Sequence, residues 1–214
     1  SLLSRESSFL FNNVLLVGQP GSGRSTIAYA FAKKVVEGRS FANLNDKRVL
    51  ELDMQAVFSG LDTPGDILER LKIIFSEAVN SGNVILVIDE IHNYLGSEKG
   101  PAAINITPII LPYLSSSNFQ VIGITSYEAY HKYIETNPSA KNLFVKVEVN
   151  EPTAQQTIFI LEDMLPGLER RYDVSVSYRI LRDVVKLTER YIQNAPFPGK
   201  AIDILTEVLS YASS

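Results

Sequence analysis

The spacing of hydrophobic and polar residues divides the chain into a series of predicted strands and helices. Two short runs, 14–17 and 84–88, are apolar throughout, which is typical of strands buried on both faces of a parallel sheet. The run at 84–88 is the most apolar in the chain, so we expect it at the centre of the sheet. Further strands are predicted at 48–53 and 119–125. Valines alternate with charged residues at 145–149, which indicates an edge strand.

Apolar residues at helical spacing separate these predicted strands. The first helix, which begins after a glycine-rich stretch, places Ile27, Phe31 and Val35 on one face. Three more helices are predicted over 66–80, 108–114 and 126–134, and a loop of small residues over 96–105. Strands that alternate with helices favour an α/β fold with a parallel sheet.

After Glu151 the pattern contains helices only. Thr153 and Gln156 have the spacing of a capping box, which opens a helix that Pro166 is expected to end. Two more helices are predicted over 177–192 and 199–212. A length of 214 residues is long for one domain and short for two equal ones. The sequence therefore predicts an α/β core at 1–150 and a small helical subdomain at 151–214.

Composition and charge narrow the range of partners. Twenty basic and twenty-four acidic residues give a net charge of −4, so no nucleic-acid partner is expected. No apolar run approaches the ~20 residues that span a bilayer, so no membrane partner is expected. The absence of cysteine excludes disulfides and thiolate metal sites and fits the cytoplasmic location that we expect. Because the first residue is Ser1, we expect a piece of a longer protein.

A glycine-rich loop follows the first strand with the spacing of a P-loop. In such a loop, backbone N–H groups surround a phosphate chain at a helix N-terminus, and glycine permits both the close approach and the unusual φ angles. Arg24 stands where this motif has lysine. The predicted nucleotide-binding residues are Gly18, Gln19, Pro20, Gly21, Ser22, Gly23, Arg24, Ser25 and Thr26.

A pair of acidic residues follows the strand at 84–88. Phosphoryl transfer to water needs a magnesium ion and an oriented water molecule. Ser25 would contact Mg²⁺ directly, Asp89 would hold it through a water molecule, and Glu90 would act as the general base. A polar strand end that opens a turn is the alternative for Asp89 and Glu90 alone, and their combination with the glycine loop favours the nucleotide site.

Hydroxyl groups end the strand at 119–125. Ser126 is a candidate catalytic residue that senses the γ-phosphate, and a simple cap at the strand end explains its position equally well. The two histidines, His92 and His131, are expected to be structural.

Seven segments resemble one known family and occur in its order along nearly the whole chain. They are GQPGSGRST, KRVLELDM, GDILERLK, ILVIDEIH, VIGITSYEAYHKYIE, VEVNEPT and GKAIDIL. Together they resemble the Clp-type AAA+ unfoldases, and specifically the first of the two ATPase domains of these ring chaperones.

The resemblance implies a five-stranded parallel sheet flanked by helices, with a small C-terminal helical lid. It implies that ATP or ADP binds with Mg²⁺ between the two parts, with the adenine near Ile158 and Ile160. It also implies partners: other AAA+ subunits in a hexameric ring, an unfolded polypeptide that passes through the pore, and a protease.

The sequence departs from this family at three functional positions. Arg24 replaces the P-loop lysine, and Asn142-Leu143 replaces the pair of arginines that act in a neighbouring subunit. The pore-loop aromatic residue corresponds to Thr63, between Asp62 and Pro64. These departures affect phosphate binding, catalysis between subunits and substrate grip, and all three indicate lost activity. We therefore expect weak or lost ATP hydrolysis. A fully active unfolding ATPase is the alternative, and an AAA+ initiator or clamp loader acting on DNA is a third.

Overall fold

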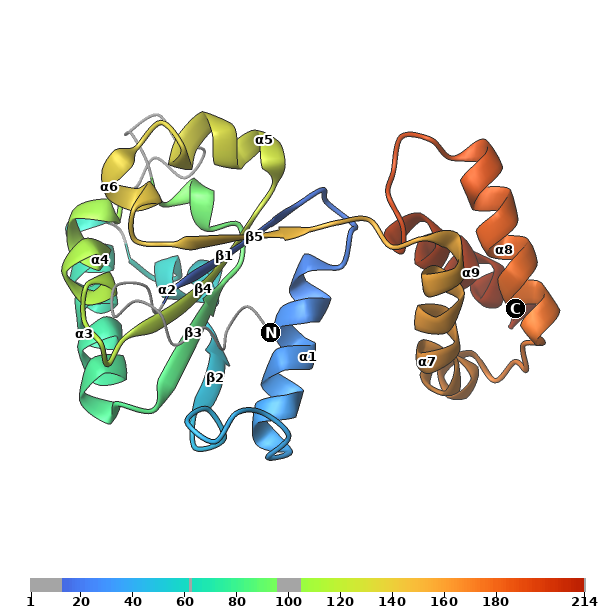
Figure 1. Ribbon diagram of the computed structural model, residues 1–214, viewed down its shortest axis with the longest axis horizontal. Helices are drawn as coiled ribbons and strands as arrows, with labels where there is room; N and C mark the ends of the chain where they lie inside the picture. The colour runs from blue at the N-terminus through green and yellow to red at the C-terminus, as the bar shows by residue number, and fades with distance from the viewer. Residues whose placement is uncertain (1–12, 62, 96–104, 214) are drawn as a thin grey trace. The chain divides into compact units, whose positions relative to one another are not determined.

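The computed structural model describes residues 13–61, 63–95 and 105–213 (Figure 1). The expectations for Asp62 and for most of the 96–105 loop lie outside these residues. Contacts divide the chain into two compact units. The first unit contains the described residues up to Val17 together with Ser25–Glu148. The second unit contains Gly18–Arg24 and the described residues from Val149 onward. The division at residue 150 stays a prediction, because the observed units place the glycine loop with the later residues.

The first unit is built on a five-stranded sheet with the order β2-β3-β4-β1-β5. The strands are β1 (Val14–Gly18), β2 (Arg48–Glu51), β3 (Val84–Ile88), β4 (Gln120–Thr125) and β5 (Val145–Val149). β4 pairs in parallel with both β1 and β3, and β3 pairs in parallel with β2. The predicted parallel sheet and the edge position of β5 are confirmed.

The expectation that 84–88 forms the sheet centre is wrong, because β4 is the middle strand. All five residues of β3 are buried. A wholly apolar run therefore indicates that a strand is buried on both faces, and it does not indicate that the strand is the middle one of the sheet. β4 is less apolar because it contains Gly123. A Cβ atom at Gly123 would lie 2.9 Å from Leu15 Cδ1 and 3.0 Å from Ile91 Cγ2, so the close packing of its neighbours requires glycine there.

Helices cover both faces of this sheet (Figure 1). They are α1 (Arg24–Val36), α2 (Met54–Phe58), α3 (Pro64–Ser81), α4 (Thr107–Leu114), α5 (Tyr127–Ala129) and α6 (Pro138–Lys141), with a 3₁₀ turn η2 (Ile91–Asn93) and a π-helical turn η3 (Tyr130–Ile134). α1 buries Ala28 and Val35, but Ile27 is 46% exposed, so the face predicted for this helix is wrong at Ile27. The small side chain of Ala28 occupies the buried position instead.

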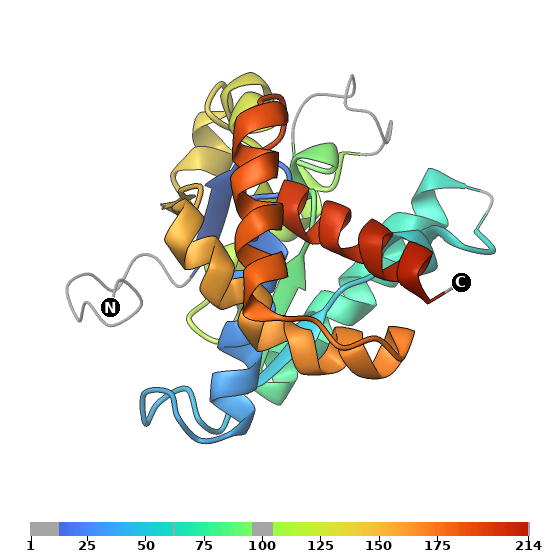
Figure 2. The same ribbon diagram turned by 90° about the vertical axis from the view of Figure 1, so that its right-hand side faces the viewer.

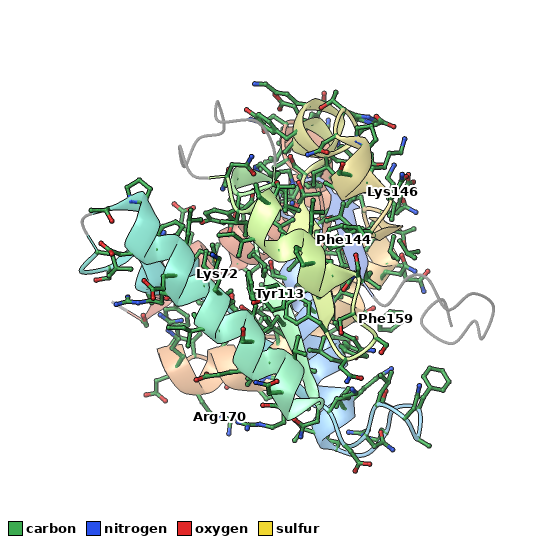
Figure 3. All side chains as sticks on the ribbon, turned by 90° about the vertical axis from the view of Figure 1, so that its left-hand side faces the viewer. Lys72, Tyr113, Phe144, Lys146, Phe159 and Arg170 are labelled. Atoms are coloured by element: carbon green, nitrogen blue, oxygen red, sulfur yellow. The ribbon has the colours of Figure 1, made fainter. Side chains whose placement is uncertain are left out.

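Aromatic side chains of α3, of α4 and of Phe119, the residue before β4, meet in the core. The ring of Phe75 lies 5.5 Å from both Tyr113 and Phe119. Tyr113 Oη lies 3.0 Å from Ser76 Oγ and donates to Lys72 O at 3.5 Å, and Figure 3 shows α3 and α4 side by side here. The buried residues of α3 are Ile67, Leu71, Phe75 and Ala78, which lie on one face of the helix.

The second unit contains three helices: α7 (Ala154–Tyr172), α8 (Tyr178–Tyr191) and α9 (Gly199–Ala212) (Figure 2). Their shared core includes Leu161, Leu181, Leu205 and Leu209. The predicted capping box is confirmed, because Gln156 N donates to Thr153 Oγ1 at 3.2 Å and Thr153 N donates to Gln156 Oε1 at 2.9 Å. Among the helices of the described residues, none has the length and apolar character needed to cross a membrane.

Pro166 does not end α7, and this prediction is wrong. The helix continues for six residues to Tyr172. Proline removes one backbone hydrogen bond and costs about 3 kcal/mol inside a helix. Leu165, Leu168 and Tyr172 pack against the core of the second unit. Burial of these side chains, at about 1.5–3 kcal/mol for each one fully buried, offsets the lost hydrogen bond.

We expect Pro166→Ala to stabilise the second unit. The substitution restores a backbone N–H and should raise the free energy of unfolding by about 2 kcal/mol. Urea unfolding followed by circular dichroism measures it, since the chain has no tryptophan. Gly167→Ala in the same helix is the matched control, with no atom within 4 Å of the new Cβ and an expected gain of about 1 kcal/mol. A Pro166→Ala protein no more stable than the parent would contradict this explanation.

Candidate functional site

The carboxyl ends of the three middle strands meet at one edge of the sheet. Val17 of β1 pairs with Thr125 of β4, and Ile88 of β3 pairs with Gly123. Because the strands are parallel, Asp89 and Ser126 follow neighbouring strands at the same edge. Ligands of open α/β sheets bind at such an edge.

The glycine loop in the second unit has a backbone that only glycine adopts easily. Gly21 and Gly23 have φ angles of 88° and 91°. Ser22 N donates to Gln19 O at 3.1 Å, which closes a turn. A Cβ atom at Gly18 would lie 2.7 Å from Val149 O, so the loop begins at a close approach between two backbones.

A turn before α9 packs against this loop within the second unit. Gly199 N donates to Gly21 O at 3.0 Å, and Pro196 Cγ would lie 3.6 Å from a Cβ at Gly21. A Cβ at Gly199 would lie 3.0 Å from Gly21 O, so this contact also requires glycine. The turn therefore holds one side of the loop in place.

An ion pair between the buried Lys200 and the exposed Glu151 supports the turn, and sequence reasoning missed it. Glu151 Oε1 accepts from Phe197 N at 2.6 Å and lies 3.9 Å from Lys200 Nζ. Lys200 Nζ also donates to Ile192 O at 3.0 Å and lies 4.2 Å from the Phe197 ring centroid. The segment GKAIDIL does not predict this ion pair, because nothing in the sequence relates residue 200 to residue 151.

The end of the loop enters α1. Arg24 is the first residue of this helix and is 8% exposed, so its guanidinium is enclosed by protein. Gln19, Pro20 and Thr26 are exposed.

Ser25 and Asp89 meet in the first unit. Ser25 Oγ donates to Asp89 Oδ2 at 2.9 Å, and Asp89 Oδ1 accepts from Glu90 N at 2.8 Å. A hydroxyl and a carboxylate are the oxygen ligands that Mg²⁺ prefers, and this pair therefore fits the ion. Within the described residues no three His, Asp or Glu side chains converge on one point, so phosphate and water oxygens would complete the coordination.

Glu90 has an unusual backbone. Its φ and ψ angles are 46° and 41°, in the left-handed region, and its side chain is 46% exposed. His92 Nε2 lies 3.4 Å from Glu90 Oε2. Burial, followed by the nearby charges of Asp53 and Glu90, raises the pKa of Tyr94, so this phenol stays protonated beside the acidic residues.

Ser126 caps a helix. Its hydroxyl accepts from Ala129 N at 3.1 Å at the start of α5. The neighbouring Thr125 is fully buried, and its Oγ1 lies 3.0 Å from His92 Nδ1. The capping alternative thus describes what Ser126 does here, and its role toward a γ-phosphate stays a prediction.

Ile158 and Ile160 lie on α7. Residues two apart project from different sides of a helix. Ile158 packs against the core of the second unit, while Ile160 is partly exposed. Their contact with adenine stays a prediction.

Thr63, Asn142 and Leu143 stand at positions that depart from the family. Thr63 caps α3, because its hydroxyl accepts from Asp66 N at 3.2 Å. Asn142 is exposed after α6, and Leu143 packs against the core of the first unit.

Two family models match the chain. A model described as "ATPase family associated with various cellular activities (AAA)" matches residues 14–150, and an AAA lid domain model matches 153–214.

Curated relatives and solved structures are similar over most of the chain. The chaperone protein ClpB of Aquifex aeolicus is 39% identical over 92% of this chain and 20% of its own length. The ATP-dependent Clp protease ATP-binding subunit ClpC of Staphylococcus epidermidis is 36% identical over 98% of this chain and 25% of its own. The S. cerevisiae Hsp104:casein complex superposes with a TM-score of 0.84 and 29% identity, over 94% of this chain and 34% of that one. The chain thus spans about a fifth to a quarter of these curated relatives.

We expect Gly18→Ala to displace the glycine loop. Its Cβ would lie 2.7 Å from Val149 O, so the loop N–H groups must move, and affinity for magnesium-ATP should fall roughly tenfold to hundredfold. Titration calorimetry measures this affinity. Gly167→Ala, whose Cβ meets no atom within 4 Å, is the matched control and should bind like the parent. Unchanged affinity in Gly18→Ala would show that the loop does not hold the nucleotide.

Proposed function

Because this chain belongs to the AAA family of ATPases and to its Clp-type branch, we propose that it binds ATP with magnesium but hydrolyses it weakly or not at all. In this proposal it is the ATP-binding module of a Clp-type unfoldase or of the regulatory subunit of a protease. Other AAA+ subunits would complete a hexameric ring, and an unfolded protein would be its substrate.

The binding half of the proposal is supported by the loop and by the Ser25–Asp89 pair. The backbone N–H groups around Gly21 and Gly23 would bind the β- and γ-phosphates at the start of α1. Ser25 and Asp89 would hold Mg²⁺, which neutralises charge on the phosphate oxygens. Glu90 would accept a proton from the attacking water.

Arg24 is the observation that carries the proposal of weak hydrolysis. The P-loop lysine is a compact ammonium on a slim stem, whereas guanidinium is planar and wider. Arg24 is 8% exposed, so little free space remains for its side chain to rearrange. Its positive charge still favours a bound phosphate, but the γ-phosphate must be placed to within a fraction of an ångström for in-line attack. Binding should therefore suffer less than turnover.

Asn142 and Leu143 support the same conclusion. Neither side chain can carry the positive charge that an arginine of one subunit presents to the γ-phosphate of the next. Such an arginine is worth roughly 10³–10⁵ in rate in related phosphoryl-transfer enzymes. Assembly into a ring should therefore accelerate hydrolysis little.

We expect Arg24→Lys to tighten magnesium-ATP binding about tenfold, the equivalent of one charge-assisted hydrogen bond. Turnover should stay low in this variant and rise only when Asn142→Arg is added, with a dependence on protein concentration. Calorimetry measures the binding, and phosphate release measures the turnover.

Arg170→Lys, at an exposed arginine of α7, is the matched control and should change neither quantity. An unaltered chain that hydrolyses ATP at ~1 per second or faster would refute the proposal of weak hydrolysis.

Thr63 supports weak grip on a polypeptide. An aromatic ring offers a broad contact to a passing chain, whereas Thr63 offers a methyl group and a hydroxyl that already caps α3. We expect little crosslinking of an unfolded model substrate from a photoreactive residue at position 63 in the assembled protein. Strong labelling that depends on ATP would refute this part of the proposal.

A fully active unfolding ATPase is the second candidate. The 2.9 Å hydrogen bond between Ser25 and Asp89 and the presence of Glu90 favour it, because the metal-binding pair and the general base are both retained.

A further inference from the structure

We propose that His92 is a positioning residue, which links the Glu90 carboxylate to the buried end of β4 through Thr125. The inference rests on the proposed role of Glu90 as the general base. His92 is 9% exposed and lies in η2, directly after the acidic pair. Its Nδ1 lies 3.0 Å from Thr125 Oγ1, and its Nε2 lies 3.4 Å from Glu90 Oε2.

The partners of His92 determine which ring nitrogen carries the proton. An ionised carboxylate only accepts hydrogen bonds, so Nε2 faces Glu90 as the N–H donor. In a neutral imidazole the other nitrogen is an acceptor, and the Thr125 hydroxyl then donates to Nδ1. The hydrogen bond from the Thr125 hydroxyl to Nδ1 thus leaves the Nε2–H group facing the Glu90 carboxylate, 3.4 Å from Oε2.

The imidazole is held rigidly enough to fix the direction of its N–H groups. Its ring stacks on Tyr133 of η3, with centroids 6.0 Å apart and an interplanar angle of 14°. Lys132 Nζ lies 5.0 Å from the centroid of the Tyr133 ring. Tyr133 of η3 therefore fixes the face of the His92 ring, and Thr125 fixes its Nδ1 edge. The Nε2 edge meets the side chain of Glu90, which is half exposed.

A fixed contact matters for Glu90 because a general base must accept its proton from a defined direction. The left-handed conformation of Glu90 costs about 1–2 kcal/mol, and its side chain is 46% exposed. A solvated carboxylate samples several rotamers, of which few can accept a proton from a water molecule in line with a γ-phosphate. The N–H of His92 selects among these rotamers.

Imidazole NMR tests the link directly, because the chain contains only two histidines. In the ¹⁵N-histidine-labelled 214-residue chain, we expect His92 to be protonated at Nε2 and not at Nδ1. Glu90→Gln should shift the His92 Nε2 resonance and leave His131 unchanged. Glu135→Gln is the matched control, because Glu135 pairs with His131 on the surface, and this variant should shift His131 only.

Two further measurements separate positioning from simple packing. Thr125→Val, which keeps the shape and removes the hydroxyl, should move the Nδ1 resonance. Magnesium-ATP should shift the His92 Nε2 resonance in the parent and not in Glu90→Gln, because only a carboxylate changes partners when it meets the attacking water.

The outcomes distinguish this inference from the proposed function. If calorimetry shows ATP binding and Glu90→Gln leaves His92 unchanged, the link is refuted while the nucleotide site stands. If calorimetry shows no binding but Glu90→Gln shifts His92 alone, the proposed function fails and the link between the two side chains is supported. A His92 protonated at Nδ1 alone would overturn the inference in either case.

Discussion

The close packing of β1 and η2 around Gly123 is the constraint on which the site depends. A side chain at residue 123 would collide with Leu15 on one side and Ile91 on the other. Because that side chain is missing, β4 can lie in the middle of the sheet with its parallel neighbours fully packed. The end of β3 then lies near the start of α1, and Asp89 meets Ser25 across 64 residues of sequence. The contact between Ser25 and Asp89, the pair proposed to hold Mg²⁺, is thus a consequence of sheet packing.

Local patterns predicted most of the fold. Apolar spacing and capping residues located every strand of the sheet and the three helices of the second unit, because both signals act within a few residues. The errors arose where tertiary packing decides. Pro166 ends a helix in isolation, but its neighbours in α7 bury side chains that keep the helix intact. The most apolar strand is β3, whereas the middle strand needs a glycine for its neighbours.

The candidate site was predictable where it consists of motifs and not where it consists of contacts between distant residues. Ser25, Asp89 and Glu90 belong to short patterns with a known spacing. The pairs of His92 with Thr125 and of Lys200 with Glu151 were missed, because each depends on the order of elements in space. A histidine after the acidic pair and a hydroxyl at the end of a strand were both visible in the sequence. The histidine and the hydroxyl meet only because β3 and β4 are neighbouring strands in the folded sheet.

In the proposed function, the departures from the family lower the reaction rate more than the affinity. Most of the phosphate-binding groups would be backbone N–H groups and a metal ion, so a change of side chain at position 24 would weaken binding without abolishing it. Placement and charge neutralisation in the transition state do depend on side chains, and a loss of 10³–10⁵ in rate corresponds to about 4–7 kcal/mol of barrier. In this proposal, Ser25, Asp89 and Glu90 would suffice to bind the nucleotide with its metal ion. The two arginines that Asn142 and Leu143 replace would be needed for fast hydrolysis. The proposed site would thus suit a subunit that responds to ATP without consuming it at the pace of an active neighbour.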